Sequence, residues 1–348
     1  MNEPSRQAWR AFRDLLLLLL LGLGVYLILP QITTLEHSLQ IIRGMIWWAV
    51  VLAVGAQVLS YVGSGVLLRA IAATAGDRLS VTRATLITTA SYSVGLVAGG
   101  MVGSGAATYR WMRASGTGPE SALLAGWLPA VIYDGALLVV SIFGLLYLLI
   151  VHQLTALQAL SFGLILLILG ALAAAIMWGT HHRSQLASLA TRLAGRWAAL
   201  LRRPYSPGPT QTSIGRLFHA WDRLGGGGWR GPALGAALNT VFDMLTLYFI
   251  FIAAGHLVSL AVLLAGYGLP LLLGRAPLLP GGVGIVETSM AAIYTGLGVP
   301  KEIVVVVVLI YRFISFWLPT FAGFALIPCL RHATGGFDKE PAQEGDTL

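Results

Sequence analysis

Charged residues are scarce in this sequence of 348 residues. Asp, Glu, Lys and Arg together make up 10% of it, whereas soluble globular domains carry about 25%. Hydrophobic residues make up 57%, and the mean hydropathy is +0.79. So little charge excludes a soluble globular protein, and the composition predicts an integral membrane protein.

Cysteine is nearly absent as well, because Cys329 is the single one. One thiol excludes an internal disulfide and any metal site built from cysteines. The zinc-protease pattern HExxH and the phosphate-binding pattern GxxxxGK are also missing. We therefore expect no cofactor, no metal site and no catalytic residues, and we expect that the chain is not an enzyme.

Acidic residues are outnumbered by basic ones, 14 to 22, which gives a formal net charge of +8. In a soluble protein this balance would suggest binding to nucleic acid. Here the arginines fall in gaps between apolar segments, as they do in cytoplasmic loops. The charge therefore predicts the orientation of the chain in the membrane, and nucleic acid is not an expected partner.

Several apolar runs are long enough to cross about 30 Å of hydrocarbon, which takes about 20 residues. The candidates are 12–30, 44–68, 127–150, 159–179, 232–254 and 303–330. The first follows three arginines and no small-residue cleavage site comes after it, so we expect an uncleaved span with a cytoplasmic N-terminus. Two further runs, 84–98 and 257–274, are shorter and lead directly into glycine-rich breaks.

The arginines decide what the two short runs do. If 84–102 crossed the membrane fully, eight arginines between 181 and 230 would lie outside, against the positive-inside rule. If 84–114 and 257–298 instead enter and turn back, every arginine cluster falls in the cytoplasm. We therefore predict an all-α polytopic protein of the inner membrane, with about six spans, two re-entrant helical hairpins and both termini cytoplasmic.

The interval 181–230 alternates leucine and tryptophan with arginine at helical spacing. Basic amphipathic helices of this kind lie on the membrane surface. We predict a cytoplasmic amphipathic insert here, with docking of a partner as the alternative. After Arg331, residues 332–348 form a polar cytoplasmic tail.

The two breaks share a pattern that predicts an inverted repeat. The glycines at 100 and 103 precede Pro119 with the same spacing as those at 281 and 284 precede Pro300, and Gly282 adds a further break. The predicted halves are 12–150 and 159–331, with opposite orientation. Interrupted helices in inverted repeats are typical of transporters, whose sites lie near the midplane between the halves. The hairpin glycines are Gly100, Gly103, Gly281, Gly282 and Gly284.

Five ionisable residues fall at membrane depth: Asp134, Asp243, Arg275, Glu287 and Arg312. A charge at the bilayer centre costs about 2.5–3.5 kcal/mol on insertion scales, so each needs a partner or water. Glu287 is expected to pair with Arg312 or Arg275 and, together with these two arginines, to take part in binding the substrate. The arginines could bind the phosphate of a lipid, because a guanidinium group binds phosphate through two hydrogen bonds.

Other residues have secondary or open roles in this prediction. Arg110, on the return arm of the first hairpin, would offer a phosphate site on the cytoplasmic side. Asp134 and Asp243 could carry protons or hold arginines, and the sequence leaves both readings open. Tyr133 and Asn239 accompany these charges at membrane depth.

Two motifs resemble the lysylphosphatidylglycerol synthase transmembrane region family. The more specific is P-G-G-x-G-x-x-E followed by Y-R-x-x-x-x-W-x-P, which begins at Pro280 and includes Tyr311, Trp317 and Pro319. The first-half motif falls on Gly99, Gly100, Gly103, Tyr109 and Arg110. Many relatives carry a carboxylate near the first turn, where this chain reads "GAAT". The resemblance covers about 12–331 and implies lipid translocation rather than synthesis, because synthases add a soluble aminoacyltransferase domain. It also adds Tyr311 to the expected substrate-binding residues.

The leading hypothesis is a flippase or transporter of an anionic lipid: a phospholipid, an aminoacyl-phospholipid or a polyprenyl-phosphate-linked lipid. The alternative is a non-transporting scaffold for a lipid-modifying or glycan-synthesis enzyme, docked through 181–230. A membrane-embedded enzyme acting on lipid-linked sugars is the third, and no carboxylate pair or histidine cluster at catalytic spacing supports it.

Overall fold

The computed structural model describes residues 40–98, 100–151, 156–182, 188, 191–192, 228–275 and 280–333. The described residues form helices and contain no β-strand, which confirms the all-α prediction. The elements in order are α3 (Trp47–Thr74), α4 (Val81–Val97), α5 (Met101–Ala114), α6 (Pro119–Val151), α7 (Ala156–His181), α10 (Arg230–Ala253), α11 (Leu260–Leu273), η3 (Pro280–Gly282), α12 (Ile285–Gly296), α13 (Lys301–Arg312), η4 (Phe313–Trp317) and α14 (Leu318–Ala333).

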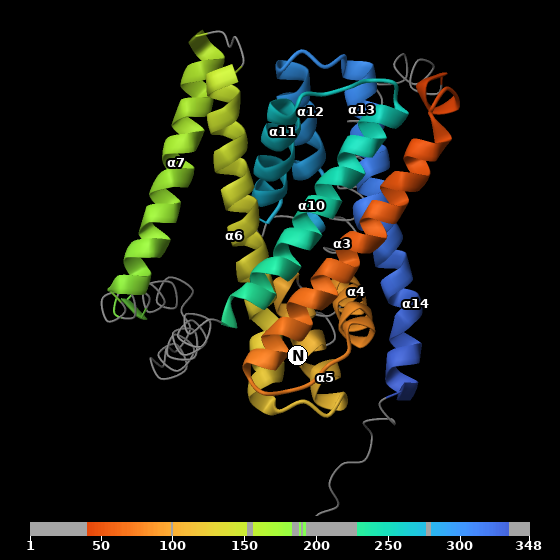
Figure 1. Ribbon diagram of the computed structural model, residues 1–348, viewed down its shortest axis with the longest axis vertical. Helices are drawn as coiled ribbons and strands as arrows, with labels where there is room; N and C mark the ends of the chain where they lie inside the picture. The colour runs from red at the N-terminus through yellow and green to blue at the C-terminus, as the bar shows by residue number, and fades with distance from the viewer. Residues whose placement is uncertain are drawn as a thin grey trace, which may run out of the picture.

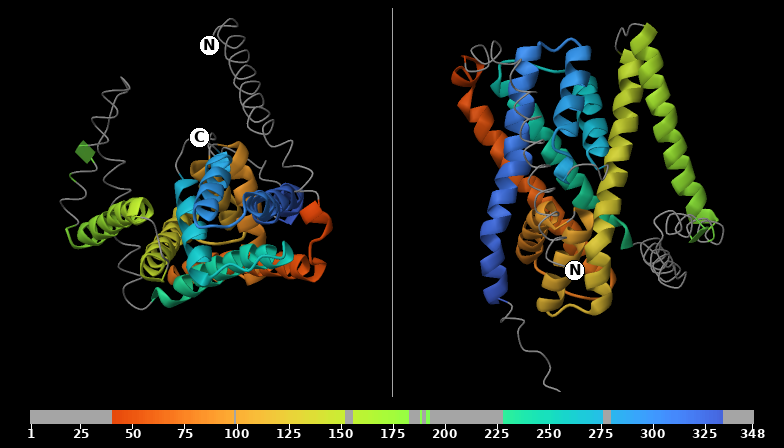
Figure 2. Two further views of the ribbon diagram at one scale, coloured as in Figure 1. Left: turned by 90° about the horizontal axis from the view of Figure 1, so that it is seen from above. Right: turned by 180° about the vertical axis from the view of Figure 1, so that it is seen from behind.

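Four helical stretches in the described part are long and apolar enough to cross a membrane: Trp47–Thr74, Pro119–Ile150, Arg230–Ala253 and Lys301–Leu330. The predicted span 159–179 falls within α7, which lies on the outer side of α6, away from the other helices (Figures 1 and 2). The predicted span 12–30, most of the insert 181–230 and the tail beyond 333 lie outside the described residues.

Two pairs of helices are too short to cross. The helices α4 and α5 have 17 and 14 residues, and α11 and α12 have 14 and 12. At 1.5 Å per residue these lengths are about 18–26 Å, less than the hydrocarbon thickness. The α4–α5 pair lies in one half of the helix bundle and the α11–α12 pair in the other (Figure 1). This is the arrangement expected of hairpins that enter from opposite sides, although re-entry, the count of six spans and the inverted repeat stay predictions.

Each short pair packs on a long helix from the other half of the chain: α4 contacts α14, and α11 contacts α6. Glycine makes both contacts close. A Cβ atom on Gly323 of α14 would lie 2.6 Å from the Thr89 carbonyl oxygen, and one on Gly144 of α6 would lie 2.7 Å from the Leu264 backbone. The two halves of the chain therefore interlock.

A polar contact joins α3 and α10 where they cross inside the bundle. The Asn239 amide group donates to the Ser64 hydroxyl group at 2.7 Å and to the Ser60 carbonyl oxygen at 3.0 Å. In return, the Ser60 hydroxyl group donates to the Asn239 carbonyl oxygen at 3.0 Å. Asn239 therefore has a structural role here, because buried polar groups must be paired with one another in an apolar bundle.

Candidate functional site

The tip between α11 and α12 is built by the segment from Pro280 to Glu287. Gly281 has φ +66° and Gly284, the N-cap of α12, has φ +87°, conformations that residues with a Cβ rarely adopt. Glu287 is the third residue of α12, and its Oε2 accepts a hydrogen bond from the Gly284 amide at 2.6 Å. The carboxylate thus caps the helix that carries it, where the helix dipole favours negative charge.

Arg312, at the end of α13, is bound to this tip. Its Nε donates to Glu287 Oε1 at 2.6 Å and its Nη2 donates to the Gly281 carbonyl oxygen at 3.0 Å. The guanidinium carbon lies 4.4 Å from the centre of the Phe316 ring, and the residue is 5% exposed. Of the two partners expected for Glu287, the structure therefore pairs it with Arg312 and not with Arg275.

The chain directly after Arg312 forms a π-helical turn, η4. Such turns insert one extra residue into a helix and are frequent at functional sites. Within this turn Phe316 lies beneath the Arg312 guanidinium group, and Trp317 stacks against Phe321 with ring centres 6.2 Å apart. The turn thus places an aromatic ring under the arginine that holds the tip.

Arg275 forms a second ion pair, with Asp134 of α6, at a distance of 3.2 Å from Nε to Oδ1. Its guanidinium carbon lies 4.7 Å from the centre of the Tyr133 ring. The side chains of Arg275 and Asp134 are 38% and 35% exposed, whereas that of Arg312 is 6% exposed. We call this pair the open pair, because its side chains are more exposed although Asp134 Oδ1 itself is buried, and we call the Arg312 pair the closed pair.

Tyrosines extend the surface around the open pair. Tyr92 of α4 is 42% exposed and lies near Arg275 and Asp134. Its ring meets the ring of Tyr61 of α3 edge-on, with centres 6.4 Å apart. Four elements of the chain, α3, α4, α6 and the tip after α11, thus meet around one arginine and one carboxylate. We call Tyr61, Tyr92, Tyr133, Asp134 and Arg275 the open-pair surface.

Asp243 of α10 has tyrosines as partners. Its Oδ2 accepts hydrogen bonds from the hydroxyl groups of Tyr267 and Tyr311, both at 2.8 Å. Asp243 is 7% exposed and Tyr311 is fully buried. The hydroxyl group of Tyr311, which the sequence analysis expects to bind substrate, donates to Asp243 in this structure, and its role in binding stays a prediction. Among the described residues no arginine pairs with Asp243, whereas Asp134 pairs with Arg275.

Arg110 lies apart from both ion pairs. It is exposed on α5, and neither ion pair formed by the described residues includes it. Gly100, with φ +68°, and the buried Gly103 build the tip between α4 and α5. The structure thus brings the charges of the second half together with Asp134 from the first, and leaves Arg110 outside this cluster.

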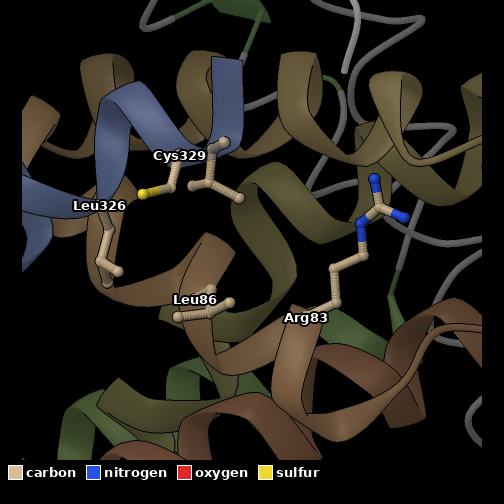
Figure 3. Close-up of a pocket in the computed structure, with 5 residues that line it drawn as sticks. Arg83, Leu86, Leu326 and Cys329 are labelled. Carbon is tan, nitrogen blue, oxygen red and sulfur yellow. The ribbon is translucent and has the colours of Figure 1, made fainter. Parts of the chain in front are cut away.

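A pocket of about 350 Å³ lies elsewhere, between α4 and α14. It is lined by Arg83, Leu86, Leu326, Cys329 and Leu330 (Figure 3). None of the predicted site residues lines it. The described residues also contain no group of three or more His, Cys, Asp or Glu side chains that could hold a metal ion.

The sequence analysis did not identify several residues that contact or surround Asp243, Arg275 and Arg312. They are Gln57, Tyr61, Tyr92, Tyr267 and Phe316. Tyrosines inside apolar segments were the available signal, because a buried hydroxyl group needs a partner. Tyr267 in particular stands between two glycines in the short run 257–274. Its partner Asp243 lies on another helix, so the sequence could not identify the pair.

Comparison with known proteins agrees with this architecture. The family model for the lysylphosphatidylglycerol synthase transmembrane region matches residues 15–323. The chain is 36% identical over 88 residues to a UPF0104 membrane protein of Methanothermobacter thermautotrophicus, which covers 25% of this chain and 26% of the relative. It is also 34% identical over 85 residues to a UPF0104 membrane protein of Pyrococcus horikoshii, and this match covers 24% of this chain and 25% of the relative.

The matched segments therefore span about a quarter of the length of these relatives. The family model, by contrast, covers most of the chain, including both short helix pairs and the five ionisable residues that the sequence predicts at membrane depth. This protein is thus a multi-pass membrane protein that belongs to the lysylphosphatidylglycerol synthase transmembrane region family.

Proposed function

We propose that this protein moves an anionic lipid across the cytoplasmic membrane without changing it chemically. The observation that carries the proposal is the open ion pair of Arg275 and Asp134, surrounded by tyrosines and adjacent to membrane-crossing helices. A phospholipid, an aminoacyl-phospholipid or a polyprenyl-phosphate-linked lipid would present a phosphate group to such a site.

The chemistry of the pair suggests how a phosphate group binds. An arginine keeps its charge and can donate two parallel hydrogen bonds to phosphate oxygens. A lipid phosphate would take the place of Asp134 beside Arg275, and Asp134 would take it back when the lipid leaves. In this proposal Arg312 and Glu287 form the closed pair that holds the tip, and Gly282 of the tip packs against Gly274, the residue before Arg275.

The arrangement of the helices supports a transporter with inverted repeats. Ser60 and Asn239 lie 179 residues apart and contact each other. Ser80 and Ser259 are equally far apart in sequence, and each accepts a hydrogen bond from the amide three residues later at the start of α4 or α11. Equivalent positions that meet lie on the pseudo-two-fold axis of such a repeat, where transporters place their sites.

Orientation is part of the proposal. Starting from a cytoplasmic N-terminus, the α4–α5 pair would enter from the cytoplasm and the α11–α12 pair from the opposite side. The open-pair surface would then lie between the tips of the two hairpins, where non-helical backbone at membrane depth is tolerated because it lines a cavity.

Native mass spectrometry of the detergent-extracted protein tests whether the site holds such a lipid. We expect an anionic lipid to remain bound to the wild-type protein. In Arg275→Gln the amount of bound lipid should fall at least about tenfold, because the substitution removes one charge-assisted contact. The control is Arg69→Gln, which changes an exposed arginine of α3. A protein that retains a partner enzyme but no lipid would favour the scaffold alternative instead.

A further inference from the structure

Asp243 is a carboxyl group inside the bundle, and no side-chain cation among the described residues forms an ion pair with it. It is 7% exposed, and the two ion pairs of the described residues, Arg275 with Asp134 and Arg312 with Glu287, do not include it. Two tyrosine hydroxyl groups bind one of its oxygens, Oδ2. A charge buried without a cationic partner is strongly disfavoured, so such a carboxyl group has reason to accept a positive charge.

Oxygen atoms without hydrogen-bond partners lie on its neighbours. Gln57 Oε1 and Thr240 Oγ1 are both buried and unpartnered within the described structure, in residues that are 4% and 3% exposed. The Gln57 side chain from α3 interacts with the Asp243 carboxyl group. A rotation of the Gln57 amide group would exchange donor for acceptor, so that it could serve either the charged or the protonated carboxyl group.

A chain of tyrosine side chains leads from Asp243 to the open-pair surface. The Tyr267 hydroxyl group donates to Asp243, and Tyr133 packs against the buried cluster that contains Tyr267. Tyr133 also lies beneath Arg275. Hydroxyl groups both donate and accept, so such a chain can relay a proton.

We propose that Asp243 binds and releases a proton, and that this step drives lipid movement at the open-pair surface. The inference rests on the proposed function and deepens it by naming the coupling ion. Water at the Arg275–Asp134 pair gives a proton to the Tyr133 hydroxyl group, Tyr133 gives its own proton to Tyr267, and Tyr267 gives its own to Asp243 Oδ2, with which it is hydrogen-bonded; release runs in the reverse order. No covalent step is involved.

The groups that face Asp243 come from the helices packed around it, and apart from Arg312 they are neutral. Arg312 acts on Asp243 only at longer range, because its guanidinium group is bound to Glu287 and Gly281. The facing groups are Gln57 and Tyr61 of α3, Tyr133 of α6, Tyr267 of α11, and Tyr311 and Arg312 of α13.

The connections of Asp243 explain how a proton could move the tip. Tyr267 belongs to α11, which leads to Arg275, and Tyr311 directly precedes Arg312. Protonation weakens both tyrosine hydrogen bonds, because a neutral acceptor is weaker than a charged one. The two elements that carry the arginines would then move more freely relative to α10.

Infrared difference spectroscopy of the full-length protein in vesicles tests the site without any lipid movement. We expect the C=O stretching band of a protonated carboxyl group to appear on acidification, to vanish in Asp243→Asn and to persist in Asp77→Asn, a loop carboxyl group outside the bundle. Should Asp243→Asn fail to fold, Tyr267→Phe provides a second variant: removal of one donor should move the titration of the band to more alkaline pH. A band that neither substitution alters overturns the proposal.

Transport of a fluorescent anionic lipid under imposed gradients tests the coupling. We expect a pH gradient to accelerate lipid movement several-fold and the acceleration to vanish in Asp243→Asn, with equilibrium exchange retained. Acceleration by a sodium gradient alone, or a pH effect that persists in Asp243→Asn, overturns the assignment of the proton. If the infrared band depends on Asp243 but the wild type moves no lipid, the proposed function fails while the proton site stands.

Discussion

Two arginines at the ends of neighbouring elements differ in how much of each guanidinium group water can reach. The Arg312 side chain is 6% exposed and has three partners: a carboxylate, a carbonyl oxygen and a ring. The Arg275 side chain is 38% exposed, with one carboxylate and one ring. Leaving a buried arginine without its carboxylate partner destabilises a protein much more than leaving an exposed arginine without one. We therefore assign a structural role to Arg312 and lipid binding to Arg275.

The closed pair gives a prediction at this scale. Glu287→Gln or Arg312→Gln alone should lower the free energy of unfolding by about 2–3 kcal/mol, below the 3–5 kcal/mol range for fully buried pairs because Glu287 is 21% exposed. The double variant should recover most of this loss, since no charge is left unpaired. Thermal unfolding in detergent measures it, and a double variant as unstable as the sum of the single variants would contradict the structural assignment.

Asp77, in the loop between α3 and α4, gives a prediction about pH. Its Oδ2 accepts a hydrogen bond from the Gly118 amide at 2.7 Å, which joins this loop to the start of α6. The Ser121 hydroxyl group and the Gly118 amide lower the pKa of the Asp77 carboxyl group. A lowered pKa adds stability above the unfolded-state value, and this stability is lost as the pH falls through the folded-state value.

The difference in stability between wild type and Asp77→Ala should therefore be largest at neutral pH and shrink as the pH falls below about 4. Unfolding at a series of pH values measures this difference. A difference that grows toward acid would show that the carboxylate has another role.

At the scale of helices, the sequence could predict where they break but not what the breaks contact. The glycines and prolines marked both tips, because few other residues reach positive φ. The short list of ionisable residues limited Glu287 to two partners. The π-helical turn η4 and the bonds from Asp243 to Tyr267 and Tyr311 depend on packing between segments 24 and 68 residues apart, which no local pattern encodes.

The tip glycines give a prediction at this scale. Gly281→Ala should destabilise the protein by about 1–3 kcal/mol, because alanine is strained at φ +66° and its Cβ atom would collide with the Phe316 ring. Gly163→Ala in α7, with open space around it, should be neutral or stabilising, since alanine favours helix. Unfolding midpoints of the two variants compare them, and equal midpoints would contradict the role of the tip.

At the scale of the whole molecule, composition alone established an integral membrane protein, because 10% charged residues cannot cover a soluble surface. The positions of the arginines then predicted an orientation for each segment, which stays a prediction. The interlocking of α4 with α14 and of α11 with α6 lay beyond the sequence, because close contacts through single glycines depend on which helix faces them.

The topology is testable with single cysteines in a Cys329→Ser background. Cysteines at Ser115 and Thr210 should react with an impermeant thiol reagent only after the membrane is opened. Cysteines at Gln153 and Thr295 should react in intact cells. Labelling of position 115 from outside would show that the α4–α5 pair crosses the membrane, and it would contradict the predicted inverted repeat.

The central claim is that Arg275 lets an anionic lipid cross the membrane. The most direct measurement is the rate at which a head-group-labelled anionic lipid changes leaflet in vesicles that contain the purified protein. The account predicts that wild type and Arg69→Gln move this lipid faster than empty vesicles, and that Arg275→Gln slows it at least about tenfold, the loss expected for one charge-assisted phosphate contact. Equal rates in wild-type and empty vesicles, or an undiminished rate in Arg275→Gln, would contradict it.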